Sequence, residues 1–135
     1  MDLESKALIE HYYIPKLLGP FNSKHEDIIP SWSYEEEGVE VYLLGGHFNV
    51  SFDFKPNLKR KRGKIFYWRD TTILTSDDDE LRALISSYAE KYGLKLQPKK
   101  EDKYSSFEIT GSYDADNAEK IGKLIKTIDD LIDLY

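Results

Sequence analysis

Asp53-Phe54-Lys55 is the tripeptide whose residue types come nearest to a catalytic motif. An acid and a lysine spaced in this way at a strand end occur in metal-dependent nucleases, where carboxylates hold Mg²⁺ and the lysine steadies the attacked phosphate. A second carboxylate could come from Asp27, Glu40 or Asp70. The expected order of elements fits a nuclease poorly, because another strand precedes the next helix. We therefore expect no catalytic residue here and lean toward a protein that is not an enzyme.

The other residue types that bind metals or cofactors form no pattern. His11, His25 and His47 fall on three different segments without the spacing of metal ligands. The chain has no glycine-rich phosphate loop, no GxSxG nucleophile elbow and no HExxH sequence. We expect neither a metal site nor a cofactor.

The densest positive charge lies between residues 55 and 64, which hold six of the 19 basic residues and no acid: Lys55, Lys59, Arg60, Lys61, Arg62 and Lys64. The rest of the chain, with 13 basic and 25 acidic residues, carries a net charge of −12. This stretch, called the basic hairpin, would have to grip a nucleic acid locally, because the remainder repels one.

Two interpretations of the basic hairpin remain open. In one, its cations contact phosphates, while the run Phe66, Tyr67, Trp68 and Arg69 behind it gives a stacking platform, with Tyr67 or Trp68 against a base. In the other, the hairpin is a solvated tip and the aromatic residues pack within the protein.

Length and composition indicate one soluble domain. The chain has 135 residues, of which 40% are hydrophobic and 33% charged, so residues 1–135 fit a single core. It lacks an apolar run of about 18 residues, which a membrane-spanning helix needs. The acidic start MDLESKALIE does not resemble a signal peptide, so we expect a cytoplasmic protein without a membrane partner. One glutamine, one methionine and no cysteine, beside many charges, are also typical of thermophiles.

The first half of the chain predicts a helix followed by three strands. Residues 2–13 have one apolar helical face, which Pro15 ends or kinks, and residues 19–31 have the composition of a loop. We expect strands at Val39–Leu44, Phe48–Phe54 and Lys64–Leu74, with Gly45-Gly46 as a two-residue turn and the basic hairpin between the last two.

The second half predicts two helices around two short strands. Ser76 has the position of an N-cap for a helix that extends through Tyr92 and ends at Gly93. Strands are expected at Leu94–Gln97 and Tyr104–Ser112. The last helix, Asp114–Tyr135, has an apolar stripe and the Asp116 and Glu119 spacing of a capping box. The resulting class is α+β, in the order α-β-β-β-α-β-β-α, with an antiparallel twisted sheet and helices mainly on one face.

One face of this sheet is expected to stay open. Asn49, Ser51 and Asp53 alternate with large apolar residues, so they should point away from the helices. If Phe66 and Trp68 share that face, it is too apolar for plain solvent exposure and would be a dimer or partner interface. The alternative is that residues 19–31 fold across it.

The element order, with the terminal amphipathic helix Ala118–Tyr135 behind five short strands, resembles type III secretion chaperone-like domains. The resemblance covers nearly the whole chain in outline and includes no diagnostic motif. It implies a non-catalytic homodimer that binds an extended segment of another protein. We therefore expect a protein-binding module, of chaperone or adaptor type, with a protein partner or a second copy. Nucleic-acid binding through the basic hairpin is the alternative.

Overall fold

A computed structural model of the chain describes residues 2–21, 27–32, 37–43, 46–54, 60–71, 78–98 and 105–134. In this part of the chain, six strands form one sheet in the order β1-β2-β3-β4-β6-β5, and every neighbouring pair is antiparallel. The strands are β1 (Asp27–Trp32), β2 (Glu37–Leu43), β3 (Gly46–Phe54), β4 (Lys61–Thr71), β5 (Lys95–Leu96) and β6 (Ser105–Asp114). The helical elements are α1 (Leu3–Leu8), η1 (Ile9–Tyr13), α2 (Ile14–Leu18), η2 (Gly19–Phe21), α3 (Asp78–Glu90), η4 (Ala115–Asn117) and α4 (Ala118–Leu134). The predicted α+β class is confirmed.

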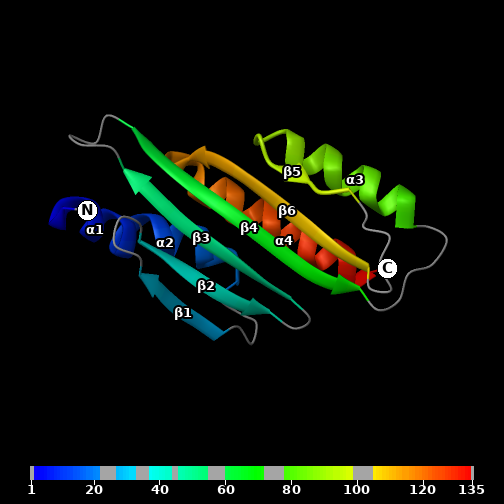
Figure 1. Cartoon of the computed structure of the whole chain (residues 1–135), viewed down its shortest axis with the longest axis horizontal. Helices are drawn as coiled ribbons and strands as arrows, with labels where there is room; N and C mark the ends of the chain where they lie inside the picture. Colours follow the sequence, from blue (N-terminus) through cyan, green and yellow to red (C-terminus); the bar gives the residue numbers. More distant parts are fainter. Residues whose placement is uncertain are drawn as a thin grey trace.

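The helices that the structure describes cover one face of the sheet. Figure 1 shows α4 behind β4 and β6, and the α1–α2 segment behind the β2–β3 side. The apolar stripe of α4 is buried as expected, with Ile121, Ile125, Ile128 and Ile132 at its centre. From α3, Leu81 and Ile85 are buried in the same core. The expected helical layer is therefore present, and it leaves the opposite face of the sheet without a described helix.

Strand β3 shows why the two faces differ. Its side chains alternate between buried and partly exposed along the whole strand. Phe48 and Phe52 are fully buried against the helices, whereas Asn49 and Ser51 point the other way. Burying one phenylalanine contributes about 2–3 kcal/mol, so this alternation fixes which face of the strand meets the helices.

The first helical segment extends further than the sequence predicts. It runs past Pro15 to Leu18 and ends in the η2 turn at Gly19–Phe21. A π-helical turn lies directly before the proline, and the Ile14 N–H bonds the Ile9 carbonyl. The wider turn accommodates a residue that lacks an N–H, so Pro15 does not end the helix at Tyr13.

This N-terminal segment packs directly on α4. The Tyr13 hydroxyl donates to Asp116 Oδ1 at 2.9 Å, across 103 positions in the sequence. At Gly122 the helices are so close that a Cβ would lie 2.1 Å from the Leu17 carbonyl oxygen. Only glycine permits that approach, so Gly122 fixes where the segment crosses α4.

Two strands differ from their predicted positions. Residues 27–31, expected in a loop, form the edge strand β1 together with Trp32, and β1 pairs with β2 in the register Ile28↔Val41. Its Pro30 is compatible with an edge strand, where only one side of the backbone needs partners. Gly46, expected in a turn, is the first residue of β3 and pairs with Leu43 and Arg69.

The second half follows the prediction more closely. Helix α3 is followed by Gly93, whose φ of 75° is the left-handed conformation that favours glycine. The start of α4 is different, because the carboxylate that caps the preceding turn belongs to Asp114, which accepts from the Asp116 N–H at 2.9 Å. Asp116 instead accepts from Tyr13. The expected N-cap Ser76 and the helix end Tyr135 lie outside the described residues.

Candidate protein-binding surface on the open sheet face

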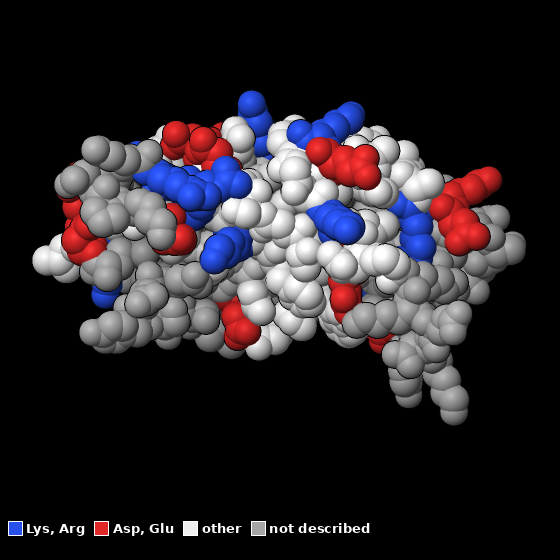
Figure 2. Space-filling model, turned by 45° about the horizontal axis from the view of Figure 1, so that its top comes forward, with Lys and Arg blue, Asp and Glu red and all other residues white. Residues whose placement is uncertain are grey.

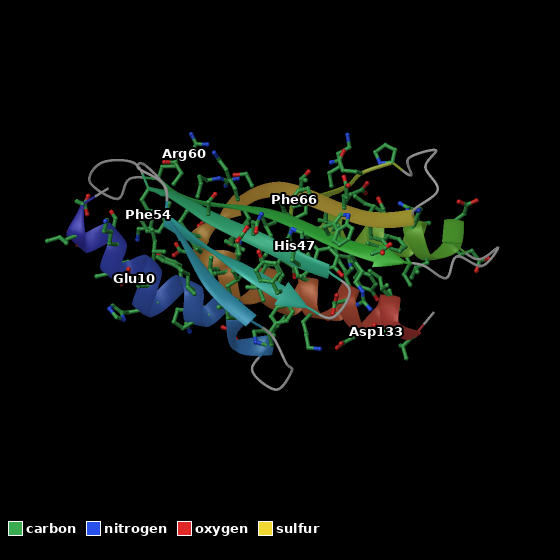
Figure 3. All side chains as sticks on the ribbon, turned by 60° about the horizontal axis from the view of Figure 1, so that its bottom comes forward. Glu10, His47, Phe54, Arg60, Phe66 and Asp133 are labelled. Carbon is green, nitrogen blue, oxygen red and sulfur yellow. The ribbon has the colours of Figure 1, made fainter. Side chains whose placement is uncertain are left out.

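The face of the sheet opposite the helices is called the open face. The strand register arranges its side chains in four rows that cross the sheet. The first row is Tyr42, His47, Trp68 and Glu108; the second is Glu40, Asn49, Phe66 and Thr110; the third is Gly38, Ser51, Lys64 and Ser112; the fourth is Asp53, Arg62 and Asp114. In Figure 3, His47 and Phe66 belong to the sheet layer, whereas Glu10 and Asp133 belong to the helices.

The second and third rows line a depression of about 480 Å³, called the sheet trough. Most of their side chains are small, and Gly38 contributes none, so the surface is low between the bulkier first and fourth rows. The trough crosses β2, β3, β4 and β6, and Phe66 is the large apolar side chain of its two rows at 36% exposure. These rows also contain amide and hydroxyl groups and the charged side chains of Glu40 and Lys64.

An aromatic row forms one wall of the sheet trough. The His47 ring lies between Tyr42 and Trp68, with ring centroids 5.8 Å and 5.6 Å away. Tyr42 is 41% exposed and donates a hydrogen bond from its hydroxyl to Glu40 Oε2 at 3.3 Å. The negative charge of Glu40, and then this hydrogen bond, raise the pKa of Tyr42. The wall thus presents ring surface to the solvent side of the sheet.

One polar atom in the trough has no partner among the described residues. Asn49 Oδ1 is buried from solvent and accepts no hydrogen bond there. A buried acceptor without a donor costs about 1–3 kcal/mol, so such atoms are rare in folded proteins. Asn49 lines the trough, so a turn of its side chain toward the trough would bring this acceptor to an N–H or O–H of a bound molecule.

The open face is mixed in charge rather than basic. Its described acids outnumber its described bases: Glu40, Asp53, Asp70, Glu108 and Asp114 against Arg62, Lys64 and Lys95. Figure 2 shows lysine and arginine gathered beside the grey residues at the β3–β4 end, while uncharged residues fill the middle of the view. A polyanion would meet net repulsion across most of this surface.

The basic hairpin is shorter than the sequence predicts. Strand β4 begins at Lys61, so Lys61, Arg62 and Lys64 are strand residues, and Arg60 precedes them as an exposed residue. Arg62 and Lys64 lie on the open face, and Arg62 Nε donates to Ser112 Oγ at 3.2 Å. Lys55 and Lys59 lie outside the described residues. The strand extends because residues 61–64 pair with β3 on one side and residues 62–64 with β6 on the other.

The four residues of the expected stacking platform divide between the two faces. Phe66 and Trp68 lie on the open face, as the partner-interface interpretation requires. Tyr67 and Arg69 lie on the covered face, because alternate residues of a strand point to opposite sides. Tyr67 is fully buried, so its expected role in stacking on a base is wrong.

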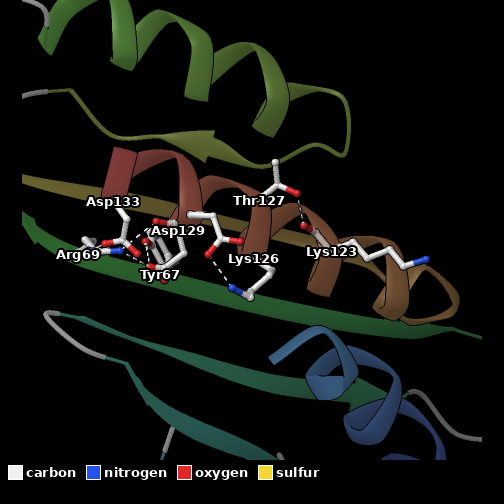
Figure 4. A network of polar contacts seen from close by, with 8 residues as sticks. Tyr67, Arg69, Lys123, Lys126, Thr127, Asp129 and Asp133 are labelled. Carbon is white, nitrogen blue, oxygen red and sulfur yellow. Dashed lines mark hydrogen bonds and ion pairs between the residues drawn. The ribbon is translucent and has the colours of Figure 1, made fainter. Parts of the chain in front are cut away.

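Tyr67 and Arg69 instead join a buried network with α4 (Figure 4). The Tyr67 hydroxyl donates to Asp129 Oδ1 at 2.6 Å, and Arg69 Nη1 donates to the same oxygen at 2.9 Å. Arg69 Nη2 also donates to Asp133. Burial first, and then the charge of Asp129, raise the pKa of Tyr67. Burial lowers the pKa of Arg69, but the hydrogen bonds and charges of Asp133 and Asp129 outweigh it, and the net shift is upward.

This network was not predicted from the sequence, although the sequence contains one signal of it. Asp129 follows Ile125 by four residues and precedes Ile132 by three, so it interrupts the apolar stripe of α4. Its exposure is 5%. An acid within a buried stripe needs a cationic or donor partner, which predicts a basic residue on the facing strand.

The described residues give little support to a metal site. Asp53 lies on the open face opposite Arg62, and it belongs to none of the acid clusters with metal-ligand spacing among these residues. The one such cluster is Asp129, Asp130 and Asp133. There the Arg69 guanidinium contacts Asp129 and Asp133, so a cation already occupies the position that a metal would take.

Comparisons with family models, with curated proteins and with solved structures find no match to this chain. None of the described helices is both long and apolar enough to cross a membrane. The geometry of the open face is therefore the basis on which a function is inferred.

Proposed function

We propose that this protein is a non-enzymatic protein-binding module whose sheet trough binds an extended segment of a partner polypeptide. The observation that carries the proposal is the trough itself: exposed aromatic rings beside a buried acceptor, Asn49 Oδ1, which has no donor among the described residues. Such a combination costs stability unless a ligand uses it.

The size of the trough suits a short extended segment. It crosses four strands, which spans about 14 Å at about 4.8 Å per strand. Extended chain advances about 3.3 Å per residue, so about four residues lie within it. Their backbone N–H groups suit Asn49 Oδ1, and an apolar side chain suits Phe66 and the neighbouring Trp68 ring.

A peptide selection tests this proposal. A library of random heptapeptides is selected on the protein, and the enriched peptide is titrated while its fluorescence anisotropy is followed. In the double variant Phe66→Ser, Trp68→Ser we expect at least about tenfold weaker binding, which is about 1.4 kcal/mol. The control Leu3→Ser removes another exposed apolar side chain, at 85% exposure, and should bind as wild type.

Two outcomes would contradict the proposal. One is a selection that enriches no peptide, and the other is an enriched peptide that binds the double variant as tightly as wild type. A second copy is the competing occupant, as a homodimer. Light scattering that gives a dimer for wild type and a monomer for the double variant would assign the trough to self-association.

Nucleic-acid binding is the second candidate, because Arg62 and Lys64 share the open face with Phe66 and Trp68. Single- and double-stranded nucleic acid should be titrated at two salt concentrations. Absence of binding at low salt removes this candidate. If the salt dependence of binding is unchanged after Arg60, Lys61, Arg62 and Lys64 are replaced by alanine, these residues do not contact the phosphates.

A further inference from the structure

A second groove lies on the helical side of the molecule, between α3 and the first half of α4. It has a volume of about 280 Å³ and is lined by Tyr88, Lys91, Tyr92, Lys120, Lys123, Leu124 and Thr127. Two tyrosines and a leucine give it apolar surface, and three lysines surround them. It is called the helix groove.

The charge of the helix groove is opposite to that of the whole chain. Its lining contains three lysines and no acid, whereas the net charge of the protein is −6. The nearby acid Glu119 forms ion pairs with Lys123 at 3.3 Å and with Lys16 at 4.0 Å. Lys91 Nζ lies 5.3 Å from the centre of the Tyr88 ring, a cation–π contact within the groove. The groove is thus a local positive region on an acidic protein.

Each of the two helices also carries an exposed leucine outside the groove. Leu84 lies one turn before Tyr88 on α3 and is 38% exposed. Leu134, near the end of α4, is 83% exposed. These exposed leucines lie on the same two helices, outside the residues that line the groove.

We propose that the helix groove docks an acidic amphipathic segment of a partner protein, with carboxylates against Lys91, Lys120 and Lys123 and an apolar side chain against Tyr88 and Tyr92. Charge complementarity selects this occupant, because a basic segment would be repelled and an uncharged one would add no ion pair to Lys91 or Lys120, while Lys123 already pairs with Glu119. An amphipathic helix in a groove between two helices is a common mode of recognition. The site lies on the opposite side of the sheet from the trough and does not depend on the proposed function.

The probe is a fluorescein-labelled peptide of about 16 residues. Its leucines are spaced alternately three and four residues apart, so that they share one helical face, and glutamates fill the positions between them. Its control has every glutamate replaced by glutamine. We expect the acidic peptide to bind wild type at about 50 mM salt, and to bind at least about tenfold more weakly at about 500 mM salt. The glutamine peptide should bind at least about tenfold more weakly at low salt.

The test variant is Lys91→Glu, Lys120→Glu, and its matched control is Lys6→Glu, Lys95→Glu, which makes the same change in net charge at exposed lysines elsewhere. We expect the test variant alone to lose binding by about tenfold or more, with circular dichroism unchanged in both. The variant Tyr88→Ser reports the apolar contact and should weaken binding by about threefold or more. The open-face variant Phe66→Ser, Trp68→Ser should leave the affinity of this peptide unchanged, which keeps the two sites distinguishable.

Several results would overturn the proposal. These are no binding at low salt, equal affinity for the glutamate and glutamine peptides, or equal losses in the test and control variants. Inorganic phosphate or vesicles of anionic lipid that bind this groove more tightly than the peptide would assign it to a different occupant.

Discussion

The two faces of β4 differ in how their polar and aromatic side chains are partnered. On the covered face, the polar groups of Tyr67 and Arg69 bond to carboxylates of α4. Phe66 and Trp68, the neighbours of Tyr67 in the sequence, are partly exposed on the open face. They lie near Asn49 Oδ1, which has no partner among the described residues. Unpartnered buried atoms occur on both faces among the described residues, namely Arg69 Nε and Tyr113 Oη on the covered face and Asn49 Oδ1 on the open face. The difference is that the covered face is closed by α4, whereas the open face presents Phe66 and Trp68 beside a trough.

The largest expected difference concerns two phenylalanines on neighbouring strands. Phe52 is fully buried on the covered face, so Phe52→Ala should lower the free energy of unfolding by about 3–5 kcal/mol. Phe66 is 36% exposed on the open face, so Phe66→Ala should cost less than about 1 kcal/mol. Urea unfolding measures both. Similar losses would show that the open face is covered in solution and would break the comparison.

The next largest effect is expected in the buried network. Asp129→Asn removes the negative charge that Arg69 and Tyr67 share, and should cost about 2–3 kcal/mol in free energy of unfolding. The matched change Asp133→Asn removes a carboxylate whose side chain is 49% exposed, and should cost less than about 1 kcal/mol. Equal losses of unfolding free energy in the two variants would mean that burial does not decide how strongly Arg69 pairs with Asp129 and Asp133.

A smaller effect should appear at alkaline pH. Burial, and then the hydrogen bond to Asp116, raise the pKa of Tyr13 from 10.0 to about 12. The folded state then holds this proton more tightly than the unfolded state. The stabilisation is complete below pH 10 and is lost as the pH rises to about 12. Tyr13→Phe should lose about 1 kcal/mol at pH 8 and show a flatter decline above pH 10 in urea unfolding.

Tyr67 and Tyr113 supply the internal control for this measurement. Burial raises the pKa of both, so some alkaline decline in stability should remain in Tyr13→Phe. An unchanged slope in the variant would contradict the role given to Tyr13.

The smallest effect, and the one with the opposite sign, is expected in the sheet trough. Asn49→Val removes the acceptor that has no donor among the described residues, so the free energy of unfolding should stay level or rise by up to about 1 kcal/mol. The same variant should bind the selected peptide more weakly than wild type. A clear loss of stability would show that Asn49 already has a partner in solution. Asn49 would then not be an acceptor available to a bound peptide.

Periodicity in the sequence predicted much of the fold. Alternation along β3 and the stripe of α4 identified the buried face of each element, because these patterns are local. The face of Phe66 and Trp68 stayed open in the sequence, because β4 has large side chains on both sides, and it follows only from the pairing with β3. Two local exceptions were not predictable in this way. Pro30 and Pro15 both look like breaks, yet one sits in an edge strand and the other behind a π-helical turn.

The candidate site was harder to predict, since it depends on register. The sequence shows that Asn49 and Phe66 are both polar-face candidates, but only the pairing of β3 with β4 places them side by side. Likewise, Arg69 reads as one more cation behind the basic hairpin until α4 brings Asp129 to it. Asp129 within the apolar stripe signals that a partner is needed, but the sequence does not show which residue about 60 positions away supplies it.

The close approach at Gly122 also has a consequence for the order of folding. A ribosome releases residues 9–21 well before residues 113–132, and the early segment finds its buried contacts on the late helix. Leu17 must therefore wait for α4 before its contact at Gly122 can form, whereas Phe21 can pack earlier on Phe48 of β3. Such long sequence separation slows folding. The nascent chain, rather than the finished protein, is where this molecule is most vulnerable to aggregation.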